Sequence, residues 1–139
     1  LYMPNSEELR QAGLKTTLPR LKILGILEDA ADQHFTAEDV YKRLLDSGEE
    51  IGLATVYRVL TQFEGAQLVI RHNFEGGRSV FELNDGKHHD HMVCVKCSKV
   101  IEFYNQQIEN LQTEVAEDHS FTLQEHALVM YGLCSDCVA

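Results

Sequence analysis

Residues 54–83 read ATVYRVLTQFEGAQLVIRHNFEGGRSVFEL and combine a helical pattern with the pattern of a β-hairpin. Over residues 54–64, four apolar side chains recur at the spacing of one helix face: Val56, Val59, Leu60 and Phe63. Residues 68–70 and 79–83 predict two strands joined by a turn at Gly76-Gly77. The stretch therefore predicts a helix that is followed directly by a hairpin.

Capping signals predict further helices upstream of this stretch. Ser6 can cap a short helix that ends at Gly13. Thr17 opens a second helix, since the proline two residues later has a fixed φ that suits a first turn. Thr36 and Asp39 have the spacing of a capping box and open a third helix. Three helices followed by a β-hairpin are the outline of a winged helix-turn-helix.

The second part of the chain has a different pattern. Three turn-forming residues, Asn84-Asp85-Gly86, predict a domain boundary. Beyond it the sequence predicts two strands, a helix and a long last strand: residues 89–95, 99–104, 105–118 and 121–131. We therefore expect an α+β protein, with a winged helix-turn-helix domain over residues 1–84 and a small α/β domain over residues 85–139.

Charge and hydropathy restrict the function further. The 139 residues carry 12 basic and 22 acidic side chains, a net charge of −10 that argues against a polyanionic partner unless cations are concentrated locally. Residues 1–83 hold nine of the basic side chains, so only this part can bind nucleic acid. No apolar run reaches about 18 residues and no leader of signal-peptide form is present, which predicts a cytoplasmic protein without a membrane partner.

The helix predicted over residues 54–64 has an exposed face that suits a DNA major groove. It presents small residues with one cation and an aromatic ring, where Arg58 can reach phosphate or guanine and Tyr57 can pack on thymine methyl groups. Taken alone, this is also the pattern of an ordinary amphipathic surface helix. The candidate phosphate or minor-groove contacts are Lys15, Arg20, Arg58 and Arg71, although each on its own could be a solvated charge.

Four cysteines form two C-x-x-C pairs. In a cytoplasmic chain thiols stay reduced, so such pairs are more typical of metal ligands than of disulfides. Four thiolates form a closed tetrahedral zinc site, and zinc binding would add directly to folding stability. We expect a structural Zn²⁺ held by Cys94, Cys97, Cys134 and Cys137.

The run His88-His89-Asp90-His91 predicts two further metal sites. Because side chains alternate along a strand, His89 and His91 point to one face while His88 and Asp90 point to the other. An exposed polar strand start is the simpler explanation for a lone histidine, but it is weak for four such residues before a cysteine pair. Six residues could complete the two sites, and spacing does not choose among them: His34, Glu82, Glu102, Glu109, His119 and His126.

Ligand chemistry suggests what these two sites do. Nitrogen and oxygen ligands without sulfur suit first-row divalent ions, including Fe²⁺, Mn²⁺ and Zn²⁺. A site that draws ligands from both parts of the chain would fix their relative orientation. Metal would then stabilise the geometry that binds DNA better, which is a switch.

Five stretches together resemble a known family over nearly the whole chain: Gly13-Leu14-Lys15 with Thr17-Leu18-Pro19-Arg20, Ala37-Glu38-Asp39-Val40-Tyr41, Gly52-Leu53-Ala54-Thr55-Val56-Tyr57-Arg58, Arg71-His72-Asn73-Phe74-Glu75-Gly76-Gly77 and His88-His89-Asp90-His91. They resemble the ferric uptake regulator family. The resemblance implies a homodimeric, metal-activated transcriptional repressor of iron-uptake genes that binds double-stranded operator DNA. It implies dimerisation through the C-terminal domain, and assembly beyond the dimer stays open.

The resemblance also implies roles for residues. An inter-domain regulatory site for Fe²⁺, replaceable by Zn²⁺ or Mn²⁺ in vitro, would comprise His34, Glu82, His89, His91 and Glu102. A second site would comprise His88, Asp90, Glu109 and His126, with structural Zn²⁺ on the four cysteines. Tyr57 and Arg58 match the major-groove residues and Lys15 the minor-groove contact, whereas His119 matches no ligand.

Four alternatives stay open at this point. Peroxide-sensing members resemble this chain but carry Asp in place of Glu82 and Glu102, and zinc-sensing members add a regulatory Cys that is absent here. A zinc-stabilised DNA-binding module without sensing is a third alternative. A metallohydrolase is the fourth, because His-rich and Asp-containing runs also occur in binuclear hydrolases, but the sequence has no nucleophile motif.

Overall fold

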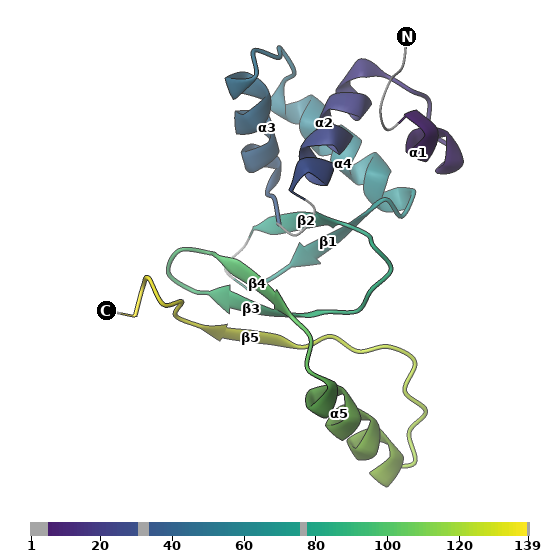
Figure 1. The fold of residues 1–139 in the computed structure, drawn as a ribbon, viewed down its shortest axis with the longest axis vertical. Coiled ribbons are helices and arrows are strands. Elements are labelled where there is room, and N and C mark those ends of the chain that lie inside the picture. The colour runs from purple at the N-terminus through teal and green to yellow at the C-terminus, as the bar shows by residue number, and fades with distance from the viewer. Residues whose placement is uncertain (1–5, 31–33, 76–77, 139) are drawn as a thin grey trace. The chain divides into compact units, whose positions relative to one another are not determined.

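The structure is a computed structural model that describes residues 6–30, 34–75 and 78–138. The chain forms two compact units, Leu1–Gly86 (unit 1) and Lys87–Ala139 (unit 2), both visible in Figure 1. The division after residue 86 and the predicted boundary after residue 84 differ by two residues. Among the helices of the described part of the chain, none is long and apolar enough to cross a membrane.

Unit 1 begins with four helices: α1 (Ser6–Gln11), α2 (Leu18–Asp29), α3 (Ala37–Asp46) and α4 (Leu53–Gly65). The predicted caps explain where two of them start. The Thr17 hydroxyl accepts a hydrogen bond from the Arg20 backbone N–H at the start of α2. At α3 the Thr36 hydroxyl and the Asp39 carboxylate each accept a backbone N–H, both at 3.0 Å, which confirms the capping box.

A hairpin closes unit 1 and completes its core. Strands β1 (Val69–Asn73) and β2 (Ser79–Leu83) pair antiparallel with Val69 opposite Leu83, and β1 extends beyond the predicted 68–70 because Asn73 still pairs with Ser79. The predicted turn at Gly76-Gly77 lies outside the described residues. The four predicted apolar positions of α4 are all buried in the common core: Val56, Val59, Leu60 and Phe63.

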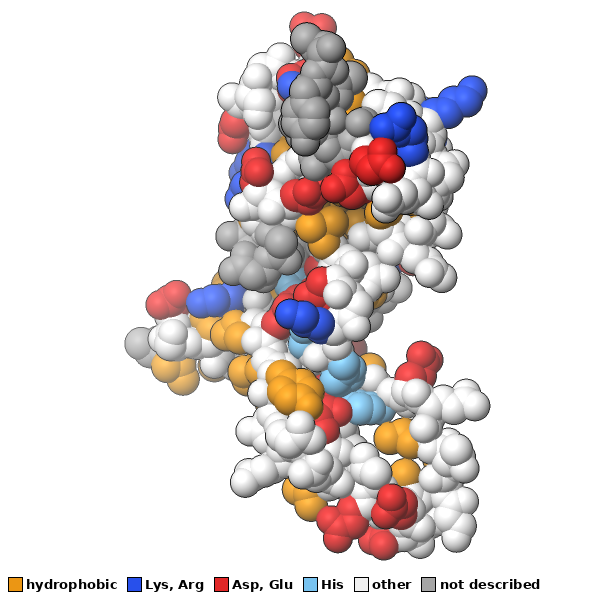
Figure 2. Space-filling model, turned by 45° about the vertical axis from the view of Figure 1, so that its right-hand side comes forward, with side chains coloured by type: hydrophobic (Ala, Val, Ile, Leu, Met, Phe, Trp, Pro, Cys, Tyr) orange, Lys and Arg blue, Asp and Glu red, His pale blue; other side chains and the backbone are white. Residues whose placement is uncertain are grey.

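Unit 2 is a three-stranded sheet with one helix. Its central strand β3 (Asp90–Cys94) pairs antiparallel with β4 (Val100–Phe103) and parallel with β5 (Val129–Gly132). Helix α5 (Gln106–Asp118) starts where the Asn105 side chain accepts two backbone N–H groups, and no residue of this fully described helix is buried. Residues 100–139 contain no Lys or Arg, and the α5 end of the molecule in Figure 2 accordingly shows acidic side chains without basic ones.

One predicted element is wrong. The long strand expected over residues 121–131 is limited to Val129–Gly132, and residues 121–128 form no strand. The reason is the length of the neighbouring strand, because β3 begins at Asp90 and His91 already lies opposite Val129. Leu128 still accepts a backbone hydrogen bond from His91 at 3.1 Å, but residues 121–127 extend past the beginning of β3, where no strand of the described chain offers hydrogen-bond partners.

Candidate metal centres and nucleic-acid interface

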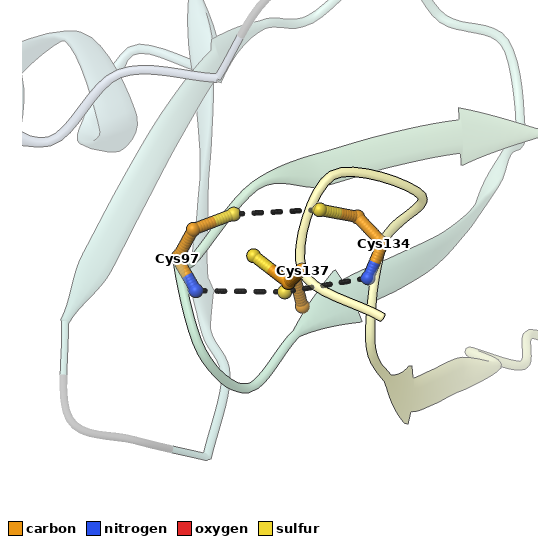
Figure 3. Close-up of side chains that lie close together, drawn as sticks. Cys97, Cys134 and Cys137 are labelled. Carbon is orange, nitrogen blue, oxygen red and sulfur yellow. Dashed lines mark hydrogen bonds between the residues drawn. The ribbon is translucent and has the colours of Figure 1, made fainter. Parts of the chain in front are cut away.

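The four cysteines converge in unit 2. Cys94 ends β3, Cys97 lies in the turn after it, and Cys134 and Cys137 follow β5, whose parallel register places Gly132 opposite Cys94. Figure 3 shows the side chains of Cys97, Cys134 and Cys137 pointing toward one another. The Sγ atoms of Cys97 and Cys134 are 3.7 Å apart, and all four sulfur atoms lie within 4.8 Å of one another. The structure thus brings the whole predicted zinc set together.

The environment of these thiols favours one thiolate before any metal binds. The backbone N–H groups of Cys134 and Cys97 both donate to Cys94 Sγ at 3.4 Å, and they lower the pKa of the Cys94 thiol to about 6. The Cys137 thiol behaves oppositely, because its contact with the Cys134 side chain and burial raise its pKa to about 12. Four thiolates in so small a volume repel one another, and a soft divalent cation such as Zn²⁺ offsets that repulsion. The donor set fits zinc.

The second predicted set also converges, from three separate segments of unit 2. His88 Nε2 lies 3.0 Å from Asp90 Oδ1 and 3.3 Å from Glu109 Oε1 on α5. His126 Nε2, from the segment before β5, lies 2.9 Å from Glu109 Oε2. Asp90 is fully buried, and its Oδ2 has no hydrogen-bond partner among the described residues. A buried carboxylate oxygen without a donor is unfavourable, so a divalent cation held by these four side chains fits the site.

The residues of the third predicted set belong to both units. In unit 1, Glu82 on β2 places Oε2 at 3.0 Å from His34 Nε2 and Oε1 at 2.8 Å from His72 Nε2. In unit 2, His89 Nε2 lies 3.4 Å from Glu102 Oε2, and His91 on β3 pairs with Glu102 on β4. Each unit therefore carries its own cluster of nitrogen and oxygen ligands.

The candidate DNA-contacting residues lie on unit 1. Tyr57 is 43% exposed on α4 and donates its hydroxyl to Glu38 Oε1 at 2.8 Å, which raises the pKa of the phenol. Lys15 and Arg58 are exposed, and neither side chain forms an ion pair or hydrogen bond with the described residues. Arg71, in contrast, is held by Glu64 at 3.2 Å and by Thr61 at 3.1 Å. The exposed face of α4 thus carries an aromatic ring and one cation without an ion-pair partner.

Comparison with known proteins identifies the family. The model of the ferric uptake regulator family matches residues 11–131. The chain belongs to this family. Its fold class, α+β with an N-terminal winged helix and a C-terminal α/β unit, is confirmed by structures of family members.

Individual relatives of the ferric uptake regulator family are close. The ferric uptake regulation protein of Legionella pneumophila is 60% identical over 135 residues, which cover 97% of this chain and 99% of the relative. The crystal structure of the Vibrio cholerae ferric uptake regulator superposes with a TM-score of 0.86 at 56% identity, over 94% of this chain and 99% of that one. The structure of the Pseudomonas aeruginosa regulator with manganese superposes with a TM-score of 0.78 at 56% identity, over 96% of this chain and 99% of that one. The chain is therefore a metal-responsive transcriptional repressor of the ferric uptake regulator type.

Two histidines lie outside the three predicted ligand sets. His72 was not among the predicted ligands, although it contacts Glu82. The register of the hairpin explains this contact. Ile70 lies opposite Glu82, and His72, two residues further along β1, lies on the same face of the hairpin as Ile70 and Glu82. His119 caps α5 and its Nδ1 lies 2.9 Å from the Val115 carbonyl oxygen, and it belongs to none of the described ligand clusters.

Proposed function

We propose that this protein represses iron-uptake genes as a homodimer that binds operator DNA when Fe²⁺ occupies a regulatory site shared by its two units. The ligands would be His34 and Glu82 from unit 1 with His89, His91 and Glu102 from unit 2. The observation that carries this proposal is the presence of a histidine and carboxylate cluster in each unit, at 2.8–3.0 Å around Glu82 and 3.4 Å at Glu102. An ion held by both clusters restricts the relative orientation of the units, which DNA binding then selects.

The donor chemistry supports a division of metals among three sites. Thiolates favour Zn²⁺ in the four-cysteine cluster, where it acts structurally. Imidazole and carboxylate ligands suit Fe²⁺ at the regulatory site, with Mn²⁺ or Zn²⁺ able to replace it in vitro. The second nitrogen and oxygen site, with Asp90 and Glu109, would tie α5 to β3 through a divalent ion. His72, the extra neighbour of Glu82, is either a ligand in place of a carboxylate oxygen or the orienting partner of Glu82.

Exposed apolar side chains support the homodimer. On α5, Leu111 and Val115 are 59% and 58% exposed, and Phe121 beyond the helix is 67% exposed. These residues line an apolar hollow of about 620 Å³ within unit 2. Since α5 buries none of its own side chains, a second copy of unit 2 is the partner whose matching apolar face would cover this surface.

The DNA contacts would come from unit 1 in a cytoplasmic protein. Tyr57 and Arg58 on α4 would enter the major groove, and Lys15 would reach the minor groove beside it. Lys15 and Arg58 are available for this role because they have no ion-pair partner among the described residues. A winged helix places such a helix in the groove and the hairpin beside it.

Operator binding in a series of divalent ions, at controlled free-metal concentration, tests the proposal. The probe is a duplex selected by the Mn²⁺-loaded wild type from a randomised pool, compared with a scrambled duplex. His91→Ala should abolish the metal dependence, and the matched control His119→Ala should keep it, because His119 lies in none of the described ligand clusters. Unchanged metal-dependent binding by His91→Ala would show that the regulatory site is elsewhere. Activation by Zn²⁺ alone would favour a zinc sensor, and loss of binding on treatment with peroxide would favour a peroxide sensor.

A further inference from the structure

Arg20 differs from the other candidate DNA contacts in what its guanidinium does inside the protein. Its Nη1 donates to the backbone carbonyl oxygen of Lys15 at 2.8 Å. Its Nε and Nη2 both donate to Gln62 Oε1 on α4, at 3.3 and 3.0 Å. One side chain of α2 therefore joins the loop that carries Lys15 to the helix that carries Tyr57 and Arg58.

The geometry distinguishes this bridge from a solvated cation. Arg20 is half-buried, whereas Lys15 and Arg58 are exposed. An arginine offers donors only, in a planar fork, so the Gln62 amide must turn its oxygen toward Arg20 and leave its NH₂ group on the other side. The fork reaches two acceptors on different segments at once. A lysine carries all its donors on one nitrogen atom and cannot reproduce this geometry.

We propose that Arg20 is a positioning residue for DNA binding, which fixes the Lys15 loop relative to α4 so that Lys15 and the α4 side chains meet neighbouring grooves together. It acts through Lys15 and Gln62, and it does not neutralise a phosphate itself. This inference rests on the proposed DNA-binding function. Two segments that must contact DNA at the same time bind more tightly when the free protein already holds them in place.

The salt dependence of operator binding separates positioning from direct contact. Each cation that neutralises a phosphate adds about 0.9 to the slope of log K against log salt. Arg20→Lys keeps the charge but removes the fork, and Gln62→Leu changes no charge at all. If Arg20 positions Lys15, both variants lose the contribution of Lys15. We expect each to lower operator affinity about tenfold and the slope by about 0.9, as Lys15→Ala does.

Combination with Lys15→Ala completes the experiment on the metal-loaded full chain. Arg20→Lys or Gln62→Leu should add less than about twofold to the effect of Lys15→Ala, because both remove the same interaction. The matched control is Arg10→Lys, which makes the same exchange at an exposed arginine paired with Glu7 on α1 and should change neither quantity. Thermal unfolding of each variant identifies a purely structural role, which would lower the melting temperature and leave the salt slope intact.

Several outcomes would overturn the inference. If Arg20→Lys keeps both slope and affinity while Arg20→Gln lowers the slope by about 0.9, Arg20 contacts phosphate directly. If Gln62→Leu and Lys15→Ala have additive effects, Gln62 contacts DNA on its own. If the wild type discriminates its selected duplex and Lys15→Ala weakens binding, the proposed function stands whichever result Arg20 gives. A wild type that fails to discriminate the duplex rejects the proposed function itself.

Discussion

Loss of the four-cysteine cluster is expected to loosen the C-terminal segment in a measurable way. Zinc would join Cys94 to Cys134, two residues 40 positions apart. Closing a loop of that length with a cross-link contributes about 4 kcal/mol through the entropy of the unfolded chain. Since β3 and β5 already pair beside the cluster, this figure is an upper limit. Replacing Cys94 by Ser removes one thiolate and exchanges the sulfur that accepts two backbone N–H groups for a neutral hydroxyl.

Hydrogen exchange at the amides of Val129–Gly132 measures this effect, because these residues form the strand next to the cluster. A loss of about 4 kcal/mol corresponds to exchange that is about a thousandfold faster. Zinc content per chain is measured on the same samples. Ser135→Ala is the matched control, since it changes the same turn and keeps all four thiols. A Cys94→Ser variant with unchanged zinc content and unchanged exchange would refute the assignment of this cluster as a structural clamp.

Three further predictions concern single side chains. Asp90→Asn should raise the melting temperature of the metal-free protein by a few degrees, because it removes a buried carboxylate whose Oδ2 has no hydrogen-bond donor among the described residues. The same substitution should lower the melting temperature of the Mn²⁺-loaded protein. A shift of the same sign in both states would contradict the role of Asp90 as a metal ligand. Burial and neighbouring carboxylates raise the pKa of Glu28, so its charged form opposes folding and the penalty disappears as the pH falls through the folded pKa. Glu28→Gln should therefore stabilise the protein slightly at pH 7 and not below pH 4.5. Urea unfolding at both pH values measures this, and equal free energies of unfolding for wild type and variant at pH 7 would show that Glu28 is unaffected by its surroundings. Tyr57→Ala should lower affinity for the selected duplex about tenfold more than affinity for the scrambled duplex, and equal losses in a binding titration would rule out base readout.

The helices and caps of unit 1 could be predicted because their signals are local. The Thr36 and Asp39 capping box and the apolar face of α4 need only a few consecutive residues, and the structure confirms both. A strand is different, since its existence depends on what lies beside it. Residues 121–127 have strand-like patterning, but β3 begins too late to pair with them. The start of β3 cannot be predicted from the properties of those residues alone.

The candidate sites show the same limit. Alternation along a strand separates His88 and Asp90 from His89 and His91, and the structure places His88 and Asp90 with Glu109. The members that come from other elements could be proposed only from the family resemblance, because spacing does not reveal which helix or loop returns to the sheet. His72 needed the hairpin register.

Charge is the property that sequence counting describes least well here. All 12 basic side chains enter the net charge of −10 equally. The structure divides the four candidate cations into two kinds. Arg20 and Arg71 donate hydrogen bonds to neighbouring segments of the protein. Lys15 and Arg58, in contrast, have no ion-pair partner among the described residues. At physiological salt, charges act over only about 8 Å, so in the proposed DNA-binding role the unpaired cations would matter more than the total charge.

The same screening separates two ways in which a regulatory ion could act. An ion that only adds positive charge would help every phosphate contact a little, and its benefit would fade as salt rises. An ion that holds the two units in one orientation would favour a particular geometry, so the ratio of metal-loaded to metal-free affinity would stay constant while both affinities fall with salt. The proposed function predicts the second mechanism, because each unit supplies carboxylate and imidazole ligands of its own. Under that proposal, the metal would contribute geometry rather than charge to recognition.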